Sequence, residues 1–310
     1  MPTELTHAHR RCPHPQARAP QADHSARAAR LFPAPPSLQG AVAAIISRDT
    51  RGLELNDAQR LTHFPATLLV TLSWFQEMEI GMVESAPDGG RWKAFGSPVL
   101  LSGSQAGPTT SWAPTQGRGV SVCFTADMAQ ALFGLDMSKI HDRIVDARPA
   151  LGNAFLPMLE DLLAAKDDAA TLSLLEHYLA PRCAALRDER TPIQSLRRLG
   201  QHWVEKLGWQ ARQWAFTRSP RQVERRIKAH SGRSLREWQT LVRTEGAFFA
   251  ARERYENGRQ PDWAELAQDE GFADQSHFSR ASKRITGFAP SEFAKRFIED
   301  ESFWLYRLWM

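Results

Sequence analysis

Basic side chains gather in one stretch of the chain, and their chemistry suits contact with nucleic acid. Between Arg218 and Arg243 there are eight Lys and Arg residues against two acidic residues, Glu224 and Glu237, so the local balance is +6 (8 − 2), whereas the whole chain carries +4. Lys and Arg neutralise phosphates, and Arg also pairs with guanine through two hydrogen bonds. The positive field is therefore concentrated in the C-terminal third of the chain.

The clearest structural pattern lies in Asp262–Pro290, beyond that stretch. Its residues predict a short helix, a sharp turn at Gly271, which tolerates a positive φ, and a second helix capped by Asp274. Phe278 and Ile285 would face inward, which leaves polar and basic residues on the outer face. A second helix of this kind enters the major groove in a helix-turn-helix unit.

An earlier segment shows the same pattern more weakly. Trp209–Phe216 predicts a first helix. Ser219 and Pro220 then predict the N-cap and the first residue of a second helix, which runs to about His230, before Gly232. The chain thus contains two predicted helix-turn-helix units.

The segment Ser234–Asn257 between the two units predicts a single long helix, because it holds no Pro and no cluster of turn residues. At 1.5 Å per residue, a helix of about 24 residues spans about 36 Å. That length is close to the roughly 34 Å that separate successive major grooves on one face of B-DNA. One chain could therefore place its two units in adjacent grooves.

The C-terminal residues resemble the AraC/XylS family of transcriptional regulators. The resemblance covers residues 208–297 and rests on Gly271–Arg280, followed by Lys283–Arg284 and Gly287–Pro290. It implies an all-helical domain with two helix-turn-helix units that binds double-stranded DNA by sequence. The predicted DNA-binding domain extends over residues 191–310.

This resemblance also implies a role for exposed residues of both reading helices. By position, the side chains that face base edges are Arg221, Glu224 and Arg225 in the first unit and Gln275, Ser276, His277 and Arg280 in the second. Phosphate contacts are expected from Lys228, Lys283 and Arg284. The alternative is that these charges form only a solvated face. Two features depart from the family: Ser282 replaces a usual phenylalanine, and the first helix at 210–217 is unusually polar.

Residues 37–190 are predicted to form a separate domain of antiparallel β-structure, a barrel or sandwich with helical additions. Short β-branched or aromatic runs separated by turn residues predict strands at 41–46, 67–75, 78–83, 91–95, 99–102 and 120–125. Helical patterns follow at 126–133, 137–144, 153–165 and 169–180, where Pro181 is expected to end or kink the last helix. The predicted fold class is α+β in two domains.

Part of this domain is similar to the cupin-like N-terminal sensing domain of one subgroup of these regulators. The similarity spans about residues 38–150 and rests on residues 63–66, 72–74, 102–103, 107–109 and 111–112. It implies a small-molecule effector. Trp74, Trp92 and Trp112 are candidates to line the effector pocket, and the alternative is that they are ordinary core aromatics.

The residues predict neither catalysis nor a metal or cofactor site. Only His63 falls in the β region, whereas a metal-dependent cupin enzyme needs two or three histidines and a carboxylate on neighbouring strands. Cys123 lies in an apolar strand and is expected to pack in the core. The rival class, a DNA-repair enzyme with the same DNA reader, needs an active Pro-Cys-His thiol, which Pro181–Cys183 does not supply. We therefore expect a regulator and not an enzyme.

The ends of the chain and the interaction surfaces give further expectations. Residues 1–36, rich in Ala, Pro, Arg and His, predict a disordered tail. Apolar residues in Ser291–Trp309 would pack on the DNA-binding domain or contact a second subunit. A stripe formed by Leu172, Leu175 and Leu179 would pack on the β domain or form a dimer seam.

Composition bears on location and partners. Three widely separated cysteines and the absence of an apolar run of about 20 residues predict a cytoplasmic protein. The expected partners are double-stranded DNA, a small-molecule effector, a second copy of the chain as a homodimer and, for an activator, RNA polymerase. No membrane partner is expected.

Overall fold

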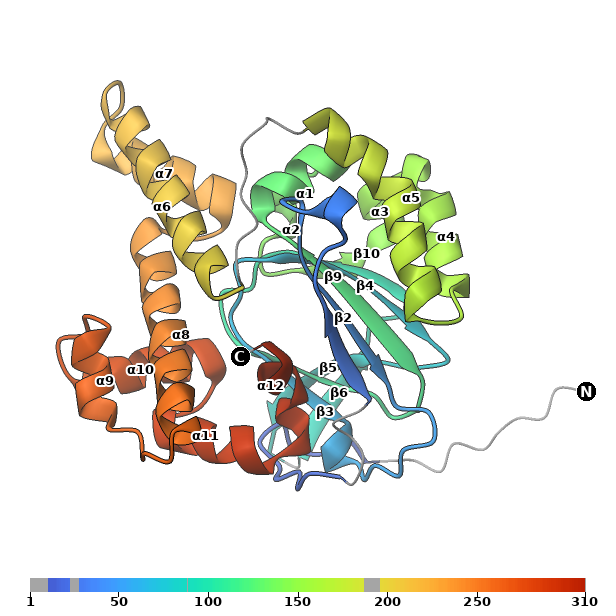
Figure 1. The fold of residues 1–310 in the computed structure, drawn as a ribbon, viewed down its shortest axis with the longest axis horizontal. Coiled ribbons are helices and arrows are strands. Elements are labelled where there is room, and N and C mark those ends of the chain that lie inside the picture. Colours follow the sequence, from blue (N-terminus) through green and yellow to red (C-terminus); the bar gives the residue numbers. More distant parts are fainter. Residues whose placement is uncertain (1–10, 23–27, 88, 187–195, 310) are drawn as a thin grey trace, which may run out of the picture.

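The computed structural model describes residues 11–22, 28–87, 89–186 and 196–309, and in it two antiparallel sheets form one side of the molecule (Figure 1). The larger sheet has the strand order β1-β2-β9-β4-β7-β10 and the smaller has the order β3-β8-β5-β6. The strands are β1 (Ala29–Phe32), β2 (Val42–Asp49), β3 (Leu61–Phe64), β4 (Val70–Gln76), β5 (Gly81–Ala86), β6 (Gly89–Ala94), β7 (Val99–Ser102), β8 (Thr109–Trp112), β9 (Arg118–Phe124) and β10 (Ile144–Asp146).

The α-helices of the described chain all come after β9. The helices of the first half are α1 (Ala126–Phe133), α2 (Met137–Ile140), α3 (Ala147–Leu151), α4 (Leu156–Ala164) and α5 (Asp168–Leu186). Those of the second half are α6 (Leu196–Ala215), α7 (Pro220–Ser231), α8 (Leu235–Glu256), α9 (Trp263–Asp269), α10 (Gln275–Thr286), α11 (Pro290–Glu299) and α12 (Trp304–Trp309). Short 3-10 turns are η2 (Pro36–Leu38), η3 (Ala58–Arg60), η4 (Asn153–Phe155) and η5 (Glu301–Phe303). The predicted α+β fold class is confirmed.

The six predicted strands correspond to β2, β4, β5, β6, β7 and β9. Four short strands were not predicted, and each pairs with a partner that is distant in sequence or lies at a sheet edge: β1, β3, β8 and β10. The helix predicted at 137–144 is wrong in its last part, because Ile144 begins β10 and pairs with Ser102 of β7. The expected boundary near residue 190 lies outside the described residues.

The prediction of a disordered tail over residues 1–36 is wrong for the two parts that the structure describes. Strand β1 pairs with β2. Residues 11–22 run along the end of α11, where the guanidinium of Arg18 donates to the carboxylate of Asp300 at 3.0 Å and Arg296 donates to the carbonyl of Gln16 at 3.0 Å. Ion pairs and backbone pairing from distant residues supply the ordering free energy that the local composition lacks.

Two expectations about helix α5 have definite outcomes. Leu175 and Leu179 are fully buried in the core beside the larger sheet, so the stripe packs within the chain rather than forming an exposed dimer seam. Helix α5 does not end at Pro181 but continues to Leu186. In the described part of the chain, no helix is long and apolar enough to cross a bilayer.

One hydrophobic core joins the sheets to the C-terminal helices. Buried residues of the larger sheet, such as Val122, belong to the same cluster as Trp203 of α6, Ile227 of α7 and Trp238 of α8. Within the same cluster, the backbone N–H of Ala66 donates to the carbonyl of Ile285 at the end of α10, at 2.8 Å. Both halves therefore fold against each other.

The C-terminal stretch returns to the β domain, which neither expectation for it anticipated. Helix α12 contacts β1 and β3, and Trp304 donates from its indole nitrogen to the hydroxyl of Thr62 at 3.0 Å. Phe293, Phe297, Phe303 and Tyr306 of this stretch pack on the aromatic cluster of the helical half, as the first expectation stated. Helix α12 therefore packs on the β domain.

His63 lies in the contact between β3 and the C-terminal aromatic cluster. Its ring is edge-on to Phe288 at 5.4 Å and tilted against Phe303 at 4.8 Å between centroids. Nδ1 is 3.2 Å from the hydroxyl of Thr110, while Nε2 has no hydrogen-bond partner among the described residues. Burial first, and then the charge of Arg296, lower the pKa of His63 from 6.5 to about 3.

We predict that His63 makes the folded chain acid-sensitive. The unfolded chain binds a proton at this position below pH 6.5 but the folded chain does not, so stability falls as the pH falls from 6.5 towards 3. Replacing His63 with Phe keeps the ring contacts and should remove roughly 3 kcal/mol of the stability difference between pH 7 and pH 4. Urea unfolding at both pH values measures this difference. His202→Phe, at an exposed position of α6, is the control and should not change it. An equal acid loss in His63→Phe and the parent chain would contradict the prediction.

Candidate DNA interface and ligand cavity

Helices α9 and α10 form a helix-turn-helix unit. The turn is built by Gly271, whose φ is +73°, and by the backbone N–H of Phe272, which donates to the carbonyl of Ala267 at 2.8 Å. The carboxylate of Asp274 accepts from the backbone N–H of His277 at 2.6 Å, so Asp274 is the N-cap of α10 as predicted. These local contacts fix the angle at which α10 leaves the turn.

The inner face of α10 packs into an aromatic cluster. Phe278 is fully buried and stacks on Trp263 with centroids 6.0 Å apart. Ser282, the position where the family usually has phenylalanine, is also fully buried, and its hydroxyl donates to the carbonyl of Phe288 at 2.7 Å. The departure therefore replaces an apolar contact with a satisfied hydrogen bond that ties α10 to the following loop.

The outer face of α10 carries the residues predicted to read DNA. Most of the predicted set is exposed: Gln275, Ser276, Arg280, Lys283 and Arg284. His277 is half-buried because its ring lies edge-on to Phe272, at 5.3 Å between centroids. The helix thus presents both hydrogen-bonding and cationic side chains to solvent.

Helices α6 and α7 form the first unit. Ser219 and Gln222 make a reciprocal capping box, in which the backbone N–H of Ser219 donates to the Gln222 side chain at 3.0 Å. Pro220 is the first helical residue, as predicted, and Ile227 anchors the inner face. The predicted first helix at 209–216 is the end of a longer one, α6, which begins at Leu196 and ends at Ala215.

The outer face of α7 also matches the predicted reading residues. Arg221, Glu224, Arg225 and Lys228 are exposed. In the free protein Glu224 and Lys228 form an ion pair of 3.0 Å along the helix, which raises the pKa of Lys228. Arg226 instead lies over the ring of Trp214 at 4.5 Å, so it ties α7 to α6.

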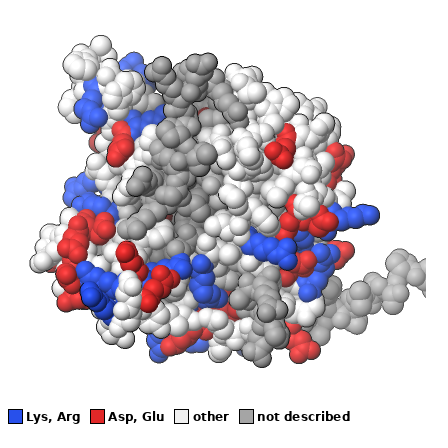
Figure 2. All heavy atoms as spheres, viewed as in Figure 1, with Lys and Arg blue, Asp and Glu red and all other residues white. Residues whose placement is uncertain are grey.

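Helix α8 links the two units. It contains 22 residues, which corresponds to about 33 Å, and Ser234 caps it through a second capping box with Glu237. Figure 1 shows α8 as one continuous column between α7 and α10. Ion pairs of Arg254 with Glu265 (2.6 Å) and Asp269 (3.3 Å) join its end to α9. On the face seen in Figure 2, basic and acidic side chains alternate over this half of the molecule.

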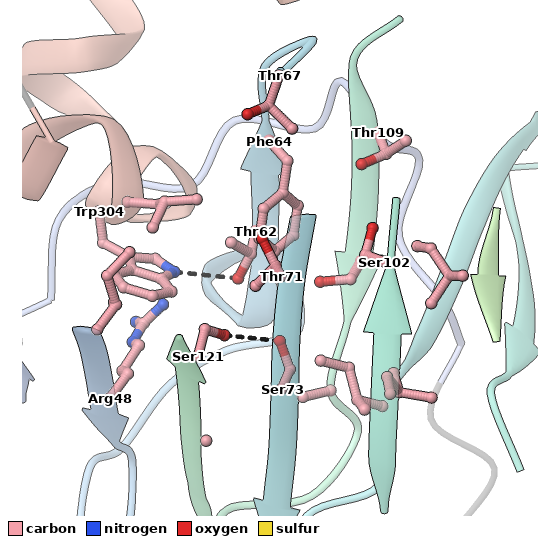
Figure 3. A pocket seen from close by; sticks show the side chains of 18 of the residues that line it. Arg48, Thr62, Phe64, Thr67, Thr71, Ser73, Ser102, Thr109, Ser121 and Trp304 are labelled. Atoms are coloured by element: carbon pink, nitrogen blue, oxygen red, sulfur yellow. Dashed lines mark hydrogen bonds between the residues drawn. The ribbon is translucent and has the colours of Figure 1, made fainter. Parts of the chain in front are cut away.

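A cavity of about 240 Å³ lies where the two sheets meet α8 and α12. Hydroxyl groups from neighbouring strands line part of its wall, and Figure 3 shows Ser73 hydrogen-bonded to Ser121 at 2.8 Å. Trp304 closes one side, with Arg48 stacked on its ring at 4.6 Å. Most of the remaining surface is apolar, which is typical of a site for a small organic ligand.

None of the three tryptophans that were candidates for the effector pocket lines this cavity. Trp74 and Trp112 are buried in the cores on either side, and Trp92 lies edge-on to Trp112 at 5.9 Å. The cavity-facing residues of β4 are Thr71, Ser73 and Phe75, which alternate with Trp74 and its core neighbours. The signal that could have found them is the polar half of the strand's two-residue period.

Glu245 is the cavity residue that sequence reasoning missed. It lies on α8 beside Gly200 of α6, and a Cβ at Gly200 would be 3.4 Å from its carboxylate oxygen. The carboxylate lines the cavity and has no hydrogen bond or ion pair within the described part of the chain. Burial alone raises the pKa of Glu245 from 4.5 to about 8.

The structure offers little nucleophilic or metal chemistry in the described residues. Burial raises the pKa of the Cys123 thiol to about 11, so the thiolate is disfavoured; Cys123 lies in the core, as predicted. The pKa of Cys12 is likewise raised, to about 11, by burial and by Asp57. No group of three or more His, Cys, Asp or Glu side chains among the described residues is arranged to hold a metal ion.

The comparison with protein families supports the helical half. Residues 215–296 match the family described as "Helix-turn-helix domain". This range begins at the last residue of α6 and reaches into α11, so it contains the reading helix α7 of the first unit, the linking helix α8 and the whole second unit. The chain therefore carries a C-terminal helix-turn-helix domain, as predicted.

Solved structures that are similar to the chain include two of ToxT from Vibrio cholerae and one of the AraC-like transcriptional activator CuxR. The apo form of a ToxT variant has 13% identity and a TM-score of 0.38, and the match covers 80% of this chain and 95% of that one. ToxT bound to an unsaturated fatty acid has 12% identity and a TM-score of 0.35, with 77% and 94% covered. CuxR has 10% identity and a TM-score of 0.25, with 92% of each chain covered. No curated protein sequence matches the chain.

We predict that Glu245 destabilises the empty protein in a pH-dependent way. Above pH 4.5 the unfolded chain loses this proton while the folded chain keeps it until about pH 8, so stability falls over that interval. Glu245→Gln should therefore gain roughly 3 kcal/mol relative to the parent chain between pH 5 and pH 8. Urea unfolding across that range is the measurement. Glu253→Gln, at an exposed site on the same helix, should show no such trend, and a parallel trend in both variants would refute the assignment.

Proposed function

We propose that this protein is a sequence-specific DNA-binding transcriptional regulator whose affinity for DNA is modulated by a small molecule in the cavity. The observation that carries the proposal is the position of α8. This helix joins the two helix-turn-helix units and also forms part of the cavity wall through Glu245. A ligand in the cavity would therefore contact the element that spaces the two reading helices.

The DNA-reading half of the proposal rests on the domain and on its outer faces. Both reading helices expose Arg side chains. The length of the linking helix α8 is close to one helical turn of DNA, so the two reading helices suit adjacent major grooves. Arg280 stands near the middle of α10 on its exposed face, where it could pair with guanine. Lys283 and Arg284 follow in the last turn, where phosphate contacts would position the helix.

The modulation half rests on thermodynamic linkage. A ligand changes DNA affinity only if it binds two arrangements of the two halves with different affinity. The cavity is walled by both sheets, α8 and α12, so a change in how the halves dock would change its shape. Effector binding and DNA binding would then influence each other reciprocally.

A regulator accounts for the chain better than an enzyme does. The proposal needs no reactive group, and the described thiols Cys12 and Cys123 have raised pKa values. The DNA-repair alternative requires an activated thiol. We therefore propose a non-enzymatic role in the cytoplasm, with homodimer formation and contact with RNA polymerase as further expectations for an activator.

We predict that Arg280 and Lys283 contribute to DNA binding in different ways. Arg280→Ala should weaken binding to the preferred site by roughly 1 to 3 kcal/mol and relax the preference at one base position. Lys283→Ala should weaken all sequences about equally and reduce the slope of log affinity against log salt by about 1. Selection of sites from random DNA, followed by binding titrations at several salt concentrations, measures both effects.

The control for these variants is Lys166→Ala, an exposed charge in the β domain, which should leave binding unchanged. The reverse pattern, with Lys283 setting base preference, would mean that the opposite edge of α10 faces the bases. If the parent chain prefers no sequence at physiological salt, the regulator proposal itself fails. The same selection with and without candidate small molecules tests modulation.

A further inference from the structure

The arginine side chains of the cavity have partners, whereas its one carboxyl group has none among the described residues. Three cavity-lining residues have acidic or basic side chains: Arg48, Arg60 and Glu245. Arg48 pairs with Glu301 at 2.7 Å, and Arg60 donates from Nε to the carbonyl of Leu55 at 3.1 Å. Among the described cavity residues, Glu245 alone is a charged group with no hydrogen bond or ion pair. An unpaired carboxylate in an apolar wall is costly unless a ligand supplies the counter-charge.

Tyr306 gives a second, independent sign of a missing partner. Its hydroxyl is buried, lines the same cavity and has no hydrogen-bond partner among the described residues. It lies close enough to Glu245 for the carboxylate charge to raise the pKa of Tyr306, after the larger effect of burial. Buried polar groups are normally satisfied by protein, water or ligand, so a carboxylate and a hydroxyl left open at one cavity mark a polar ligand group.

The aromatic side chains of the cavity favour a cation as that group. Phe64 lies on its wall (Figure 3) and Tyr306 contributes a further ring, whereas the ring of Trp304 is already covered by the guanidinium of Arg48 at 4.6 Å. Aromatic faces attract ammonium groups, and the attraction strengthens where water is excluded. An anion would lie near Glu245, and Nη2 of Arg48 is already engaged with Glu301. Nε of Arg48 has no hydrogen-bond partner among the described residues, so an anion is the alternative that the test must separate.

We infer that the cavity binds a small organic amine with an apolar body, whose ammonium group pairs with Glu245 and reaches the hydroxyl of Tyr306. This inference rests on the proposed function, since it names the chemical class of the effector for the same cavity. The hydroxyl-lined strands and the apolar wall would hold the body of the ligand. The ammonium would contact α8, the helix that spaces the two DNA-reading units.

Binding of the amine is coupled to loss of one proton. At pH 7 the Glu245 carboxyl of the empty protein holds its proton, because its pKa is about 8. An ammonium ion stabilises the carboxylate, so the carboxyl proton leaves to buffer as the ion pair forms, and charge balances. Around Glu245, Gly200 faces it from α6, and Tyr306 of α12 is the titratable group with which it interacts. Amine affinity should therefore rise from pH 6 to pH 8.

The test is calorimetric titration of the full chain with three probes of one length: n-hexylamine, n-hexanol and hexanoate. The amine should bind at least ten-fold more tightly than the alcohol or the acid at pH 7.5. Titrations in two buffers of different ionisation enthalpy should show release of up to one proton for each amine bound. Hexanoate in first place, hexanol equal to the amine, or no amine binding at millimolar concentration would each overturn the inference.

Variants separate recognition by Glu245 from general effects on folding. Glu245→Gln should reduce amine affinity at least ten-fold, abolish proton release and leave hexanol binding nearly unchanged. Glu253→Gln on the same helix should bind the amine as the parent chain does. Circular dichroism and thermal unfolding establish that both variants are folded. Undiminished amine binding by folded Glu245→Gln would contradict the assignment.

The outcome for the amine is distinguishable from the outcome for the proposed function. Site selection from random DNA is run on the same protein preparations with and without n-hexylamine. Sequence preference without amine binding would leave a DNA-binding regulator and overturn the inference about its ligand. Amine binding that depends on Glu245 but leaves DNA affinity unchanged would support the ligand class and remove the modulation half of the proposed function.

Discussion

The structure depends on one helix that is buried against two different cores. The first part of α8 places Trp238 and Leu241 in the large core that continues into the sheets. The second part places Ala247 and Phe248 in the aromatic cluster beneath the second reading helix. A helix held at both ends by buried side chains behaves as a rigid spacer, because tilting it would open one core or the other. The separation of the two reading helices is set by this constraint.

Glu245 lies between these two cores on α8, so the cavity that it lines adjoins both of them. Neither core encloses it, since it faces the cavity rather than packed side chains. A close-packed interior resists gradual deformation, so a cavity at such a joint is a place where docking can change without breaking either cluster. The free-energy cost of a charge in that cavity depends on what fills it.

Local signals in the sequence predicted most of the helical half. Ser219 and Asp274 were predicted as caps because N-capping depends on the residue and the next three positions, and Ser234 and Asp262 were the first residues of their predicted segments. In the structure each one begins a helix as an N-cap, with its side chain bonded to a backbone N–H. The turn at Gly271 could be predicted in the same way, because it depends only on the φ angle of that residue. The exposed faces followed from helical periodicity.

The features that sequence reasoning missed depend on distant residues. Strand β1 forms because β2 offers an edge, and residues 11–22 are ordered by Asp300 and Arg296 near the other end of the chain. The alternation of side chains along β4 could be recognised in the sequence. The face that points into the cavity could not, because one face of the strand packs against helices and the other lines the cavity. Trp74 was a candidate for the pocket because an aromatic residue suits a ligand, with a place in the core as the alternative. It lies on the core face, as that alternative stated, and Thr71 and Ser73 face the cavity.

The contacts between the halves limit how a signal could pass from the cavity to DNA. The end of α7 meets the β domain where the Ser104 hydroxyl lies 2.7 Å from Nδ1 of His141 and 3.5 Å from the carbonyl of Ser231. The end of α10 meets it at the bond between Ala66 and Ile285. Each reading helix is therefore held at its C-terminal end, while its N-terminal part carries the exposed predicted reading residues. A change in docking at the cavity would then alter the relative angle of two otherwise rigid units, and DNA affinity would follow because both must fit their grooves at once.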